Sequence, residues 1–459
     1  MFNPKISLLR LAFTLLIAVA GPAPLCAADW YVAPGGSGDG SAAAPFGQIQ
    51  EGINAAQPGD TVHVAPGTYT EALVTVRAGT AAQPITVRAD SARGSVTVTR
   101  SGRVLTVAHP YNWFEGLVLD GQYGNNDLVR VSSGAHGFTL RNSEVRHAGN
   151  DAIDIFAADD VLIDGSLIHH ALNPTGGRTD AHGVVGGVVR RLTVRNTEIH
   201  TFSGDGIQVD PGRSAPGWSD VTIEGCRIWL APLPNAENGF PAGTVTGENA
   251  VDTKANGSLP RARITITNTE AWGFRWPGTV GNNVAAFNLK ENIDAVVDRV
   301  TVHDSEIAFR LRGPAWVRVQ NAVVHDVDVA FRYEDNIENL RIWNSTLGSR
   351  VGRSFLAAGA SPNALDVKNL LLLGTTLPPE AAHPSNLTVP ATSFVDAANQ
   401  NYQLASGSAA IDAGVTIAEV SLDRQGTSRP QGARYDIGAF ERGGAGLPSV
   451  PMNLRIVRQ

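Results

Sequence analysis

Cysteine, lysine and long apolar runs are all scarce in this sequence. Its 459 residues include two cysteines, Cys26 and Cys226. Cys26 lies at the edge of an N-terminal segment that we expect to be removed, so an intramolecular disulfide is excluded and packing has to stabilise the fold. The formal net charge of −7 gives no basic surplus, which argues against nucleic acid or an anionic membrane surface as a partner.

One apolar run stands out, at residues 11–20. It follows Lys5 and Arg10 and precedes the small residues Ala27 and Ala28, which is the three-part pattern of a secretory signal peptide over residues 1–28. No other run approaches the roughly 18 residues that a membrane-spanning helix needs. We therefore expect a secreted protein, extracellular, at the cell surface or periplasmic, without a membrane span.

A short β-rich pattern recurs along the chain. Each copy begins with apolar, polar and apolar residues, which is the period of a strand with one buried face. The copies start at Phe138, Val161, Leu192, Val221, Ile264, Val317, Leu340 and Leu365. The shortest spacing, from Phe138 to Val161, is 23 residues, and the longer spacings contain inserts rich in Gly, Pro and Asn. A repeat of this length and period predicts an all-β fold, a right-handed parallel β-helix or solenoid.

A residue that tolerates a left-handed backbone follows each copy at a constant offset. These residues are Asn142, Gly165, Asn196, Gly225, Asn268, Asn321, Asn344 and Asn369. We expect the chain to turn a corner at this point in every rung of the coil. An apolar stripe at helical spacing, Phe46, Ile49 and Ile53, predicts an N-terminal cap helix over residues 46–56, which would cover the open end of the coil.

These features divide the chain into five parts. We expect a signal peptide at 1–28, an N-terminal cap with the first rungs at 29–80, the parallel β-helix at 81–385, a C-terminal module at 386–442 and a tail or linker at 443–459.

A second strand in each rung predicts two outward-facing columns of side chains. Its first and third residues are nearly all apolar, so alternation along the strand sends the second and fourth residues outward. The first column is Asp154, Gln208, Asp252, Asn288, Arg310 and Arg332, and the second is Phe156, Asp210, Lys254, Lys290, Arg312 and Glu334. Rungs stack about 4.8 Å apart, so a carboxylate-rich stretch would pass directly into a basic one.

The use of lysine draws attention to the second column. The chain has 36 basic residues, but its lysines are Lys5, Lys254, Lys290 and Lys368. Two of the three lysines outside the signal peptide therefore fall in one column. A lysine can lose its proton near other cations, whereas an arginine in practice cannot, so these two lysines are candidate general bases.

Both ends of the chain resemble known secreted proteins. The segment WYVAPGGSGDGSAAAPFGQIQEGINAAQPGDTVHVAPGTYTE, from Trp30, is similar to the opening of many bacterial secreted β-helix proteins, including family-nine polysaccharide lyases. The segment from Gly407 to Glu441 resembles a module that often closes such chains near a surface-anchoring tail, which implies association with the cell surface. GENAVDTKANG, from Gly247, and NNVAAFNLKEN, from Asn282, are similar to the site of family nine, and a lysine followed by arginine one rung later also resembles family-six lyases.

The resemblance implies β-elimination on a uronic-acid polysaccharide, an acidic polymer. Lys254 or Lys290 would be the base, and Arg310 or Arg312 would bind the acid sugar or assist the leaving group. Family nine implies Ca²⁺ held by oxygen ligands, here Asp180, Asp205, Asp210, Glu248, Asn249 and Asp252, although Glu248 and Asn249 stand where paired aspartates would be expected. Asn288, Arg332, Trp272 and Trp276 would contact the substrate, the tryptophans by stacking on sugar rings.

Three other functions remain open from the sequence. A glycoside hydrolase would use paired carboxylates, for which Asp180, Asp205 and Asp210 are candidates. An epimerase would share the proton abstraction, and a carbohydrate-binding surface protein would need no catalysis. His182 and the pair His169–His170 match no zinc spacing, so we expect them to be loop or surface residues.

Overall fold

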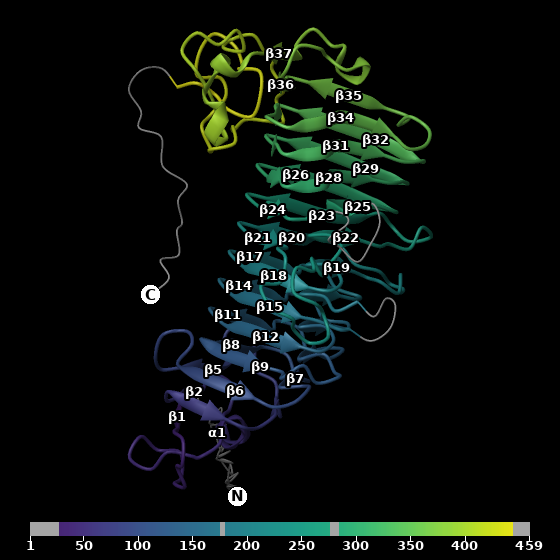
Figure 1. Ribbon diagram of the computed structural model, residues 1–459. Helices are drawn as coiled ribbons and strands as arrows, with labels where there is room; N and C mark the ends of the chain where they lie inside the picture. The colour runs from purple at the N-terminus through teal and green to yellow at the C-terminus, as the bar shows by residue number, and fades with distance from the viewer. Residues whose placement is uncertain (1–26, 175–179, 276–283, 444–459) are drawn as a thin grey trace, which may run out of the picture.

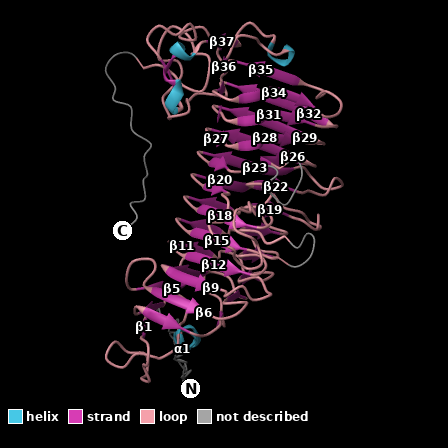
Figure 2. Cartoon of the chain, viewed as in Figure 1, coloured by secondary structure: helices cyan, strands magenta, loops and turns pink. Residues whose placement is uncertain are grey.

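The chain forms a right-handed parallel β-helix in which three long sheets run side by side (Figure 1). The computed structural model describes residues 27–174, 180–275 and 284–443. In each rung the chain passes through sheet 1, then sheet 2, then sheet 3, and every strand in these sheets pairs in parallel with the same sheet's strand from the next rung. Almost all regular structure in the described residues is strand (Figure 2).

The three sheets contain 13, 13 and 11 strands. Sheet 1 consists of β1 (Asp29–Val32), β2 (Thr61–Val64), β5 (Ile85–Ala89), β8 (Asn112–Glu115), β11 (Thr139–Arg141), β14 (Leu162–Asp164), β17 (Thr193–Arg195), β20 (Val221–Glu224), β23 (Ala262–Thr267), β26 (Ile293–Asp298), β29 (Ala315–Gln320), β32 (Ile337–Trp343) and β35 (Leu365–Lys368). Sheet 2 consists of β3 (Gly67–Tyr69), β6 (Val96–Thr99), β9 (Leu117–Asp120), β12 (Glu144–Ala148), β15 (Leu167–Ala171), β18 (Glu198–Phe202), β21 (Arg227–Trp229), β24 (Glu270–Trp272), β27 (Thr301–His303), β30 (Val323–Val324), β33 (Thr346–Leu347), β36 (Leu371–Leu373) and β37 (Leu387–Val389). Sheet 3 consists of β4 (Leu73–Val74), β7 (Leu105–Val107), β10 (Val129–Val131), β13 (Ile153–Ile155), β16 (Val184–Gly186), β19 (Ile207–Val209), β22 (Val251–Thr253), β25 (Ala285–Leu289), β28 (Ser305–Leu311), β31 (Val327–Tyr333) and β34 (Val351–Ala357).

The corner between sheets 1 and 2 is left-handed in every rung that the sequence pattern predicted. The eight predicted Asn and Gly residues have φ between 44° at Asn142 and 63° at Gly225. Between Phe138 and Leu365 the pattern overlooked one rung, that of β26, because its corner residue is Arg299, with φ of 55°. Arg299 Nε donates to the neighbouring Asp298 carboxylate at 2.8 Å, so a local ion pair accompanies this unusual corner residue.

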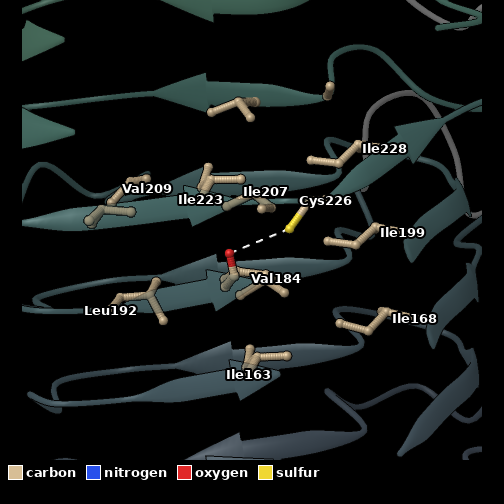
Figure 3. Close-up of a cluster of buried hydrophobic side chains, with 14 of the residues drawn as sticks. Ile163, Ile168, Val184, Leu192, Ile199, Ile207, Val209, Ile223, Cys226 and Ile228 are labelled. Carbon is tan, nitrogen blue, oxygen red and sulfur yellow. Dashed lines mark hydrogen bonds between the residues drawn. The ribbon is translucent and has the colours of Figure 1, made fainter. Parts of the chain in front are cut away.

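Apolar side chains from all three sheets fill the inside of the coil. Figure 3 shows part of this core, in which Ile163, Val184 and Ile207 converge from sheets 1 and 3. Cys226 lies in the same core, and its thiol donates to the carbonyl of Val194 at 3.4 Å. Burial raises the pKa of this thiol to about 12, so the one described cysteine is a packing residue.

The N-terminal end of the coil is covered by α1 (Ile49–Ala55). The helix begins three residues later than predicted, because Phe46 pairs with Val32 in an extended bridge and stacks on Trp30 at 5.9 Å. The backbone N–H groups of Ile49 and Gln50 donate to the Glu71 carboxylate at 2.8 and 3.0 Å, which satisfies donors that the first helical turn leaves free.

The C-terminal segment packs along the corner between sheets 1 and 2. The short helix η1 (Pro379–Ala381) precedes the last solenoid strand, and the segment after that strand contains η2 (Ala391–Ser393), β38 (Phe394–Asp396), η3 (Ala397–Asn399) and β39 (Asn401–Leu404). The last solenoid strand, β37, lies just beyond the boundary expected at residue 385. Among the described residues, no helix is long and apolar enough to cross a membrane.

The module is attached to the coil by hydrogen bonds at several rungs. Arg424 Nη2 donates to Thr301 Oγ1 at 2.7 Å, and Val415 N donates to Asn369 Oδ1 at 2.9 Å. Inside the module, Arg429 and Glu441 form an ion pair at 2.5 Å in which both side chains are fully buried. These contacts hold the C-terminal segment against the last rungs of the coil.

Candidate functional site

The outward columns predicted on sheet 3 are formed in the structure, with one extra rung. Strand pairing places Gln208 next to Asp252, Asp252 next to Asn288, and Asn288 next to Arg310. Arg310 in turn pairs with Arg332. The prediction omitted β16, because its outward residue is the apolar Val185, which separates Asp154 from Gln208.

The centre of this surface is a carboxylate shared by two lysines. Lys290 Nζ lies 2.8 Å from Asp252 Oδ1, and Lys254 Nζ lies 3.3 Å from Asp252 Oδ2. Asp252 and Lys290 are nearly buried, whereas the Lys254 side chain is 20% exposed. Burial and the charge of Asp205 raise the pKa of Asp252, although both lysines act in the opposite direction. Of the two amines, Lys254 is the more accessible to a molecule on the surface of sheet 3.

A buried histidine between two aspartates supports this centre from the preceding rungs. His182 Nδ1 lies 2.8 Å from Asp151 Oδ1, and His182 Nε2 lies 3.6 Å from Asp205 Oδ2. Burial alone would lower the pKa of His182, but the hydrogen bonds and charges of Asp151 and Asp205 outweigh it and raise the pKa to about 10. The raised pKa favours the protonated form of His182. The residue lies in a connection before β16, as expected of a loop histidine, but it is buried and not on the surface.

Gln208 contacts His182 and pairs in register with Asp252 of the lysine centre. Its Nε2 donates to Asp205 Oδ2 at 2.6 Å and also lies 2.8 Å from His182 Nε2. The second contact suits an imidazole that accepts a hydrogen bond, whereas the two carboxylates favour the imidazolium. The two carboxylates have the larger effect on the charge of His182, because charges interact strongly where water is excluded. Burial raises the pKa of Asp205, but hydrogen bonds from His182, Asn249 and Gln208 outweigh it and leave that pKa below its ordinary value.

A basic group follows on the next rungs. Arg310 Nε and Arg332 Nε approach Glu334 Oε1 at 2.9 and 3.2 Å, and Arg312 Nε approaches Glu334 Oε2 at 3.8 Å. Arg312 is the most exposed of the three, at 34% of its side chain. The predicted transition from carboxylates to guanidinium groups along sheet 3 is therefore present, and Asn288 lies at the boundary.

The six predicted calcium ligands do not gather into one cluster. Asn249 Nδ2 donates to Asp205 Oδ1 at 2.7 Å, while Asp252 holds the lysines and Asp210 Oδ1 accepts from the backbone of Ser214 at 3.1 Å. Asp180 lies close enough to His182 for their charges to interact, and burial raises its pKa. The backbone N–H of Glu248 donates to the Gly204 carbonyl at 2.8 Å.

The described residues do not fit a calcium ion in this arrangement. Amide and ammonium donors occupy the oxygens of Asp205 and Asp252, the two most central carboxylates. Within 27–174, 180–275 and 284–443, no group of three or more His, Cys, Asp or Glu side chains is placed to hold a metal ion. A calcium requirement stays a prediction.

The tryptophans expected to contact substrate are not on sheet 3 where the structure describes them. Trp272 lies on the outer side of sheet 2, stacked between Trp229 at 5.5 Å and His303 at 5.5 Å. Trp218 is buried and donates from Nε1 to the carbonyl of Lys254 at 2.6 Å, which fixes the backbone beside the candidate base. Trp276 lies outside the described residues.

Sequence reasoning missed the residues that support the site from the loops. Arg213, after β19, forms two hydrogen bonds to Glu291, at 2.9 and 2.6 Å, and Glu291 also accepts from the backbone of Ala255 at 2.7 Å. These contacts join the rungs on either side of Lys254. Neither Arg213 nor Asp151 belongs to a repeated strand position, so the repeat gave no signal for them.

Comparison with known proteins places the chain among β-helix proteins. A family described as "Protein of unknown function (DUF1565)" matches residues 33–304, more than half of the chain. No curated protein matches the sequence.

Several solved structures are similar to this chain at low sequence identity. Pectate lyase Pel9A is 17% identical with a TM-score of 0.50, and the match covers 91% of this chain and 96% of that one. The family-six polysaccharide lyase Pedsa3628 from Pseudopedobacter saltans is 16% identical with a TM-score of 0.43, covering 78% of this chain and 96% of that one. The A-module of mannuronan C-5 epimerase AlgE6 from Azotobacter vinelandii is 14% identical with a TM-score of 0.40, covering 72% and 95%. At 17% identity, the match to pectate lyase Pel9A supports the fold and leaves the activity open.

Proposed function

We propose that this chain, which belongs to the family of unknown function DUF1565, is a polysaccharide lyase that cleaves a uronic-acid-containing polysaccharide by β-elimination. The observation that carries the proposal is the pair of lysines that share the Asp252 carboxylate on the outer side of sheet 3. The proposed protein is exported and binds its polymer outside the cell or at the cell surface. The signal-peptide pattern of residues 1–28 and the C-terminal module support this part of the proposal.

Lys254 is the proposed base, because it is the more exposed of the two amines. A base for this reaction has to act in its neutral form. Lys290 pairs with the other oxygen of the same carboxylate. Asp252 positions both amines, and Trp218 holds the backbone of Lys254.

The reaction removes one proton from the uronic acid and breaks one glycosidic C–O bond. Neutral Lys254 takes the proton on the carbon next to the uronate carboxylate, and the electron pair of that C–H bond forms a carbon–carbon double bond as the glycosidic C–O bond breaks. Water protonates the leaving oxygen, and Lys254 returns the proton it gained to the resulting hydroxide before the next turnover. Arg310, Arg312 and Arg332 would bind uronate carboxylates along the polymer, where guanidinium groups form paired hydrogen bonds.

The test is an ultraviolet assay for the unsaturated product. Purified protein is incubated with polygalacturonate, alginate or chondroitin sulfate, each with and without a chelator. A lyase produces the absorbance, a hydrolase produces only reducing ends, an epimerase changes the sugar composition without cleavage, and a binding protein does none of these. Absence of an unsaturated product from every polymer tried, in the presence of added calcium, would count against the proposal.

The role of Lys254 is tested with a matched control. Lys254→Ala should lower the rate by about 10²- to 10⁴-fold, the range for loss of a general base. Lys368 pairs with Asp366 at 3.1 Å, with the same two-residue spacing but on sheet 1, so Lys368→Ala should leave the rate unchanged. Full activity in both Lys254→Ala and Lys290→Ala would contradict the mechanism.

A further inference from the structure

An exposed aromatic ring lies on the same surface as the lysine centre. Phe156 directly follows β13 in sheet 3 and is 56% exposed. Among the described residues, Trp316 on sheet 1 is the other exposed aromatic side chain, at 48%. Single exposed apolar residues are common on protein surfaces, so the position of Phe156 matters more than its exposure.

Backbone hydrogen bonds place Phe156 in register with Lys254. The N–H of the residue after each strand donates to the preceding rung: Gly187 to Ile155, Asp210 to Gly186 and Lys254 to Val209. Phe156 makes the same bond to Val131. The ring and the lysine therefore belong to one file, three rungs apart, which corresponds to about 14 Å along the coil.

One face of the ring is covered by an arginine, and the next rung contributes no side chain over the other face. Arg130, from the preceding rung, lies over the ring at 4.9 Å from its centre and is paired with Asp154. The next position in the file is Gly187, which has no side chain to cover the ring. A Cβ there would lie 2.5 Å from the backbone oxygen of Phe156, so the close approach of the two rungs requires glycine.

This arrangement differs from the aromatic file on sheet 2. There, His200, Trp229, Trp272 and His303 stack on one another from rung to rung at 4.3 to 5.5 Å, so each ring face is occupied by a neighbouring ring. Among the residues that the structure describes, no other aromatic ring stacks on Phe156 in this way.

We propose that Phe156 is a remote sugar-binding subsite, on which a pyranose ring of the polymer stacks about three rungs from the scissile bond. The C–H groups of a sugar ring carry partial positive charge and fit the negative face of an aromatic ring. The polar edges of Arg130 and Asp154 lie beside the ring and are suited to contact the sugar hydroxyls. The inference rests on the proposed function, because it assumes that an extended polymer runs along sheet 3 past Lys254.

Affinity electrophoresis measures this contact without requiring catalysis. Wild-type protein, Phe156→Ala, Phe156→Trp and Trp316→Ala are run through gels that contain polygalacturonate, alginate or chondroitin sulfate. Trp316→Ala is the matched control, because Trp316 is also exposed and also carries an arginine, Arg261, over its ring at 4.9 Å. Phe156→Ala should bind about two- to tenfold more weakly, the range for loss of one aromatic contact. Phe156→Trp should restore retardation, and Trp316→Ala should match the wild type.

The outcomes separate the subsite from the activity. Equal retardation of Phe156→Ala and wild type on a polymer that retards both would overturn the subsite, as would an equal loss in Trp316→Ala. If the wild type is retarded but forms no unsaturated product, the lyase activity is refuted. The subsite can still be tested by comparing the retardation of the variants. Retardation by none of the polymers would overturn both. For an active protein, Phe156→Ala should raise KM for the polymer without changing kcat, and should leave cleavage of oligosaccharides too short to span about 14 Å unaffected.

Discussion

The buried charge of His182 can be tested through the pH dependence of stability. His182 is held between Asp151 and Asp205, and its pKa in the folded protein is raised from 6.5 to about 10. A basic group with a raised folded pKa stabilises the protein fully below its unfolded pKa, and this contribution is lost as the pH rises toward the folded pKa. The stabilisation from His182 should therefore be complete below about pH 6.5 and decline steadily between pH 6.5 and 10.

The size of the effect follows from the two pKa values. The difference between 6.5 and about 10 corresponds to about 5 kcal/mol of unfolding free energy below pH 6.5. About 2 to 3 kcal/mol of this should be lost by pH 8.5. The perturbation is His182→Gln, which keeps a polar side chain of similar length and removes the charge. Urea unfolding at pH 6 and pH 8.5, followed by tryptophan fluorescence, measures the difference between variant and wild type at each pH.

The difference should be large at pH 6 and roughly halved at pH 8.5. The control is His136→Gln, because His136 is exposed and should leave the pH profile of the wild type unchanged. An equal difference at both pH values would refute the reasoning. It would mean that His182 is neutral throughout and accepts a hydrogen bond from Gln208, and that the two carboxylates do not control its charge.

Three further predictions concern the body of the fold. Cys226 should not react with a thiol reagent in the native protein, since burial raises its pKa to about 12, and should react once the protein is unfolded in urea. Arg429→Met should destabilise the C-terminal module by about 3 to 5 kcal/mol, because Glu441 would be left buried and unpaired, and limited proteolysis should then cut within residues 386–442. Phe309→Ala should cost about 3 to 5 kcal/mol in urea unfolding, because Phe309 is fully buried and stacks on Phe287 and Phe331; a loss below 1 kcal/mol would show that the core closes around the gap.

The coil could be predicted from sequence because most rungs use the same residue types at the corner and in the strands. Asn and Gly mark the left-handed corner, and alternating apolar residues mark the strands. Where single strands or corners between Phe138 and Leu365 escaped prediction, other residue types stand at these positions. Arg299 forms a left-handed corner without being Asn or Gly, and β16 presents Val185 and Gly186 where other rungs have a polar and a large apolar residue.

The candidate site was predictable only where it follows the repeat. Lys254, Lys290 and Asp252 have fixed positions in repeated strands, so their proximity followed from the register. His182 and Asp151 lie outside the repeated strand positions, and their contacts depend on how the connections fold over the preceding rungs. The tryptophans illustrate the same difficulty, because Trp272 is close to the site in sequence but belongs to a strand of another sheet.

The attachments of the C-terminal module have a consequence for how the molecule comes apart. Its hydrogen bonds reach from Thr301 to Asn369, so several consecutive rungs are tied to one segment. Those rungs should open together, in a single cooperative step, whereas rungs nearer the N-terminus touch mainly their immediate neighbours and can open one after another. Amide hydrogen exchange should accordingly show a shared opening free energy over residues 301–369 and a graded one toward the helix α1.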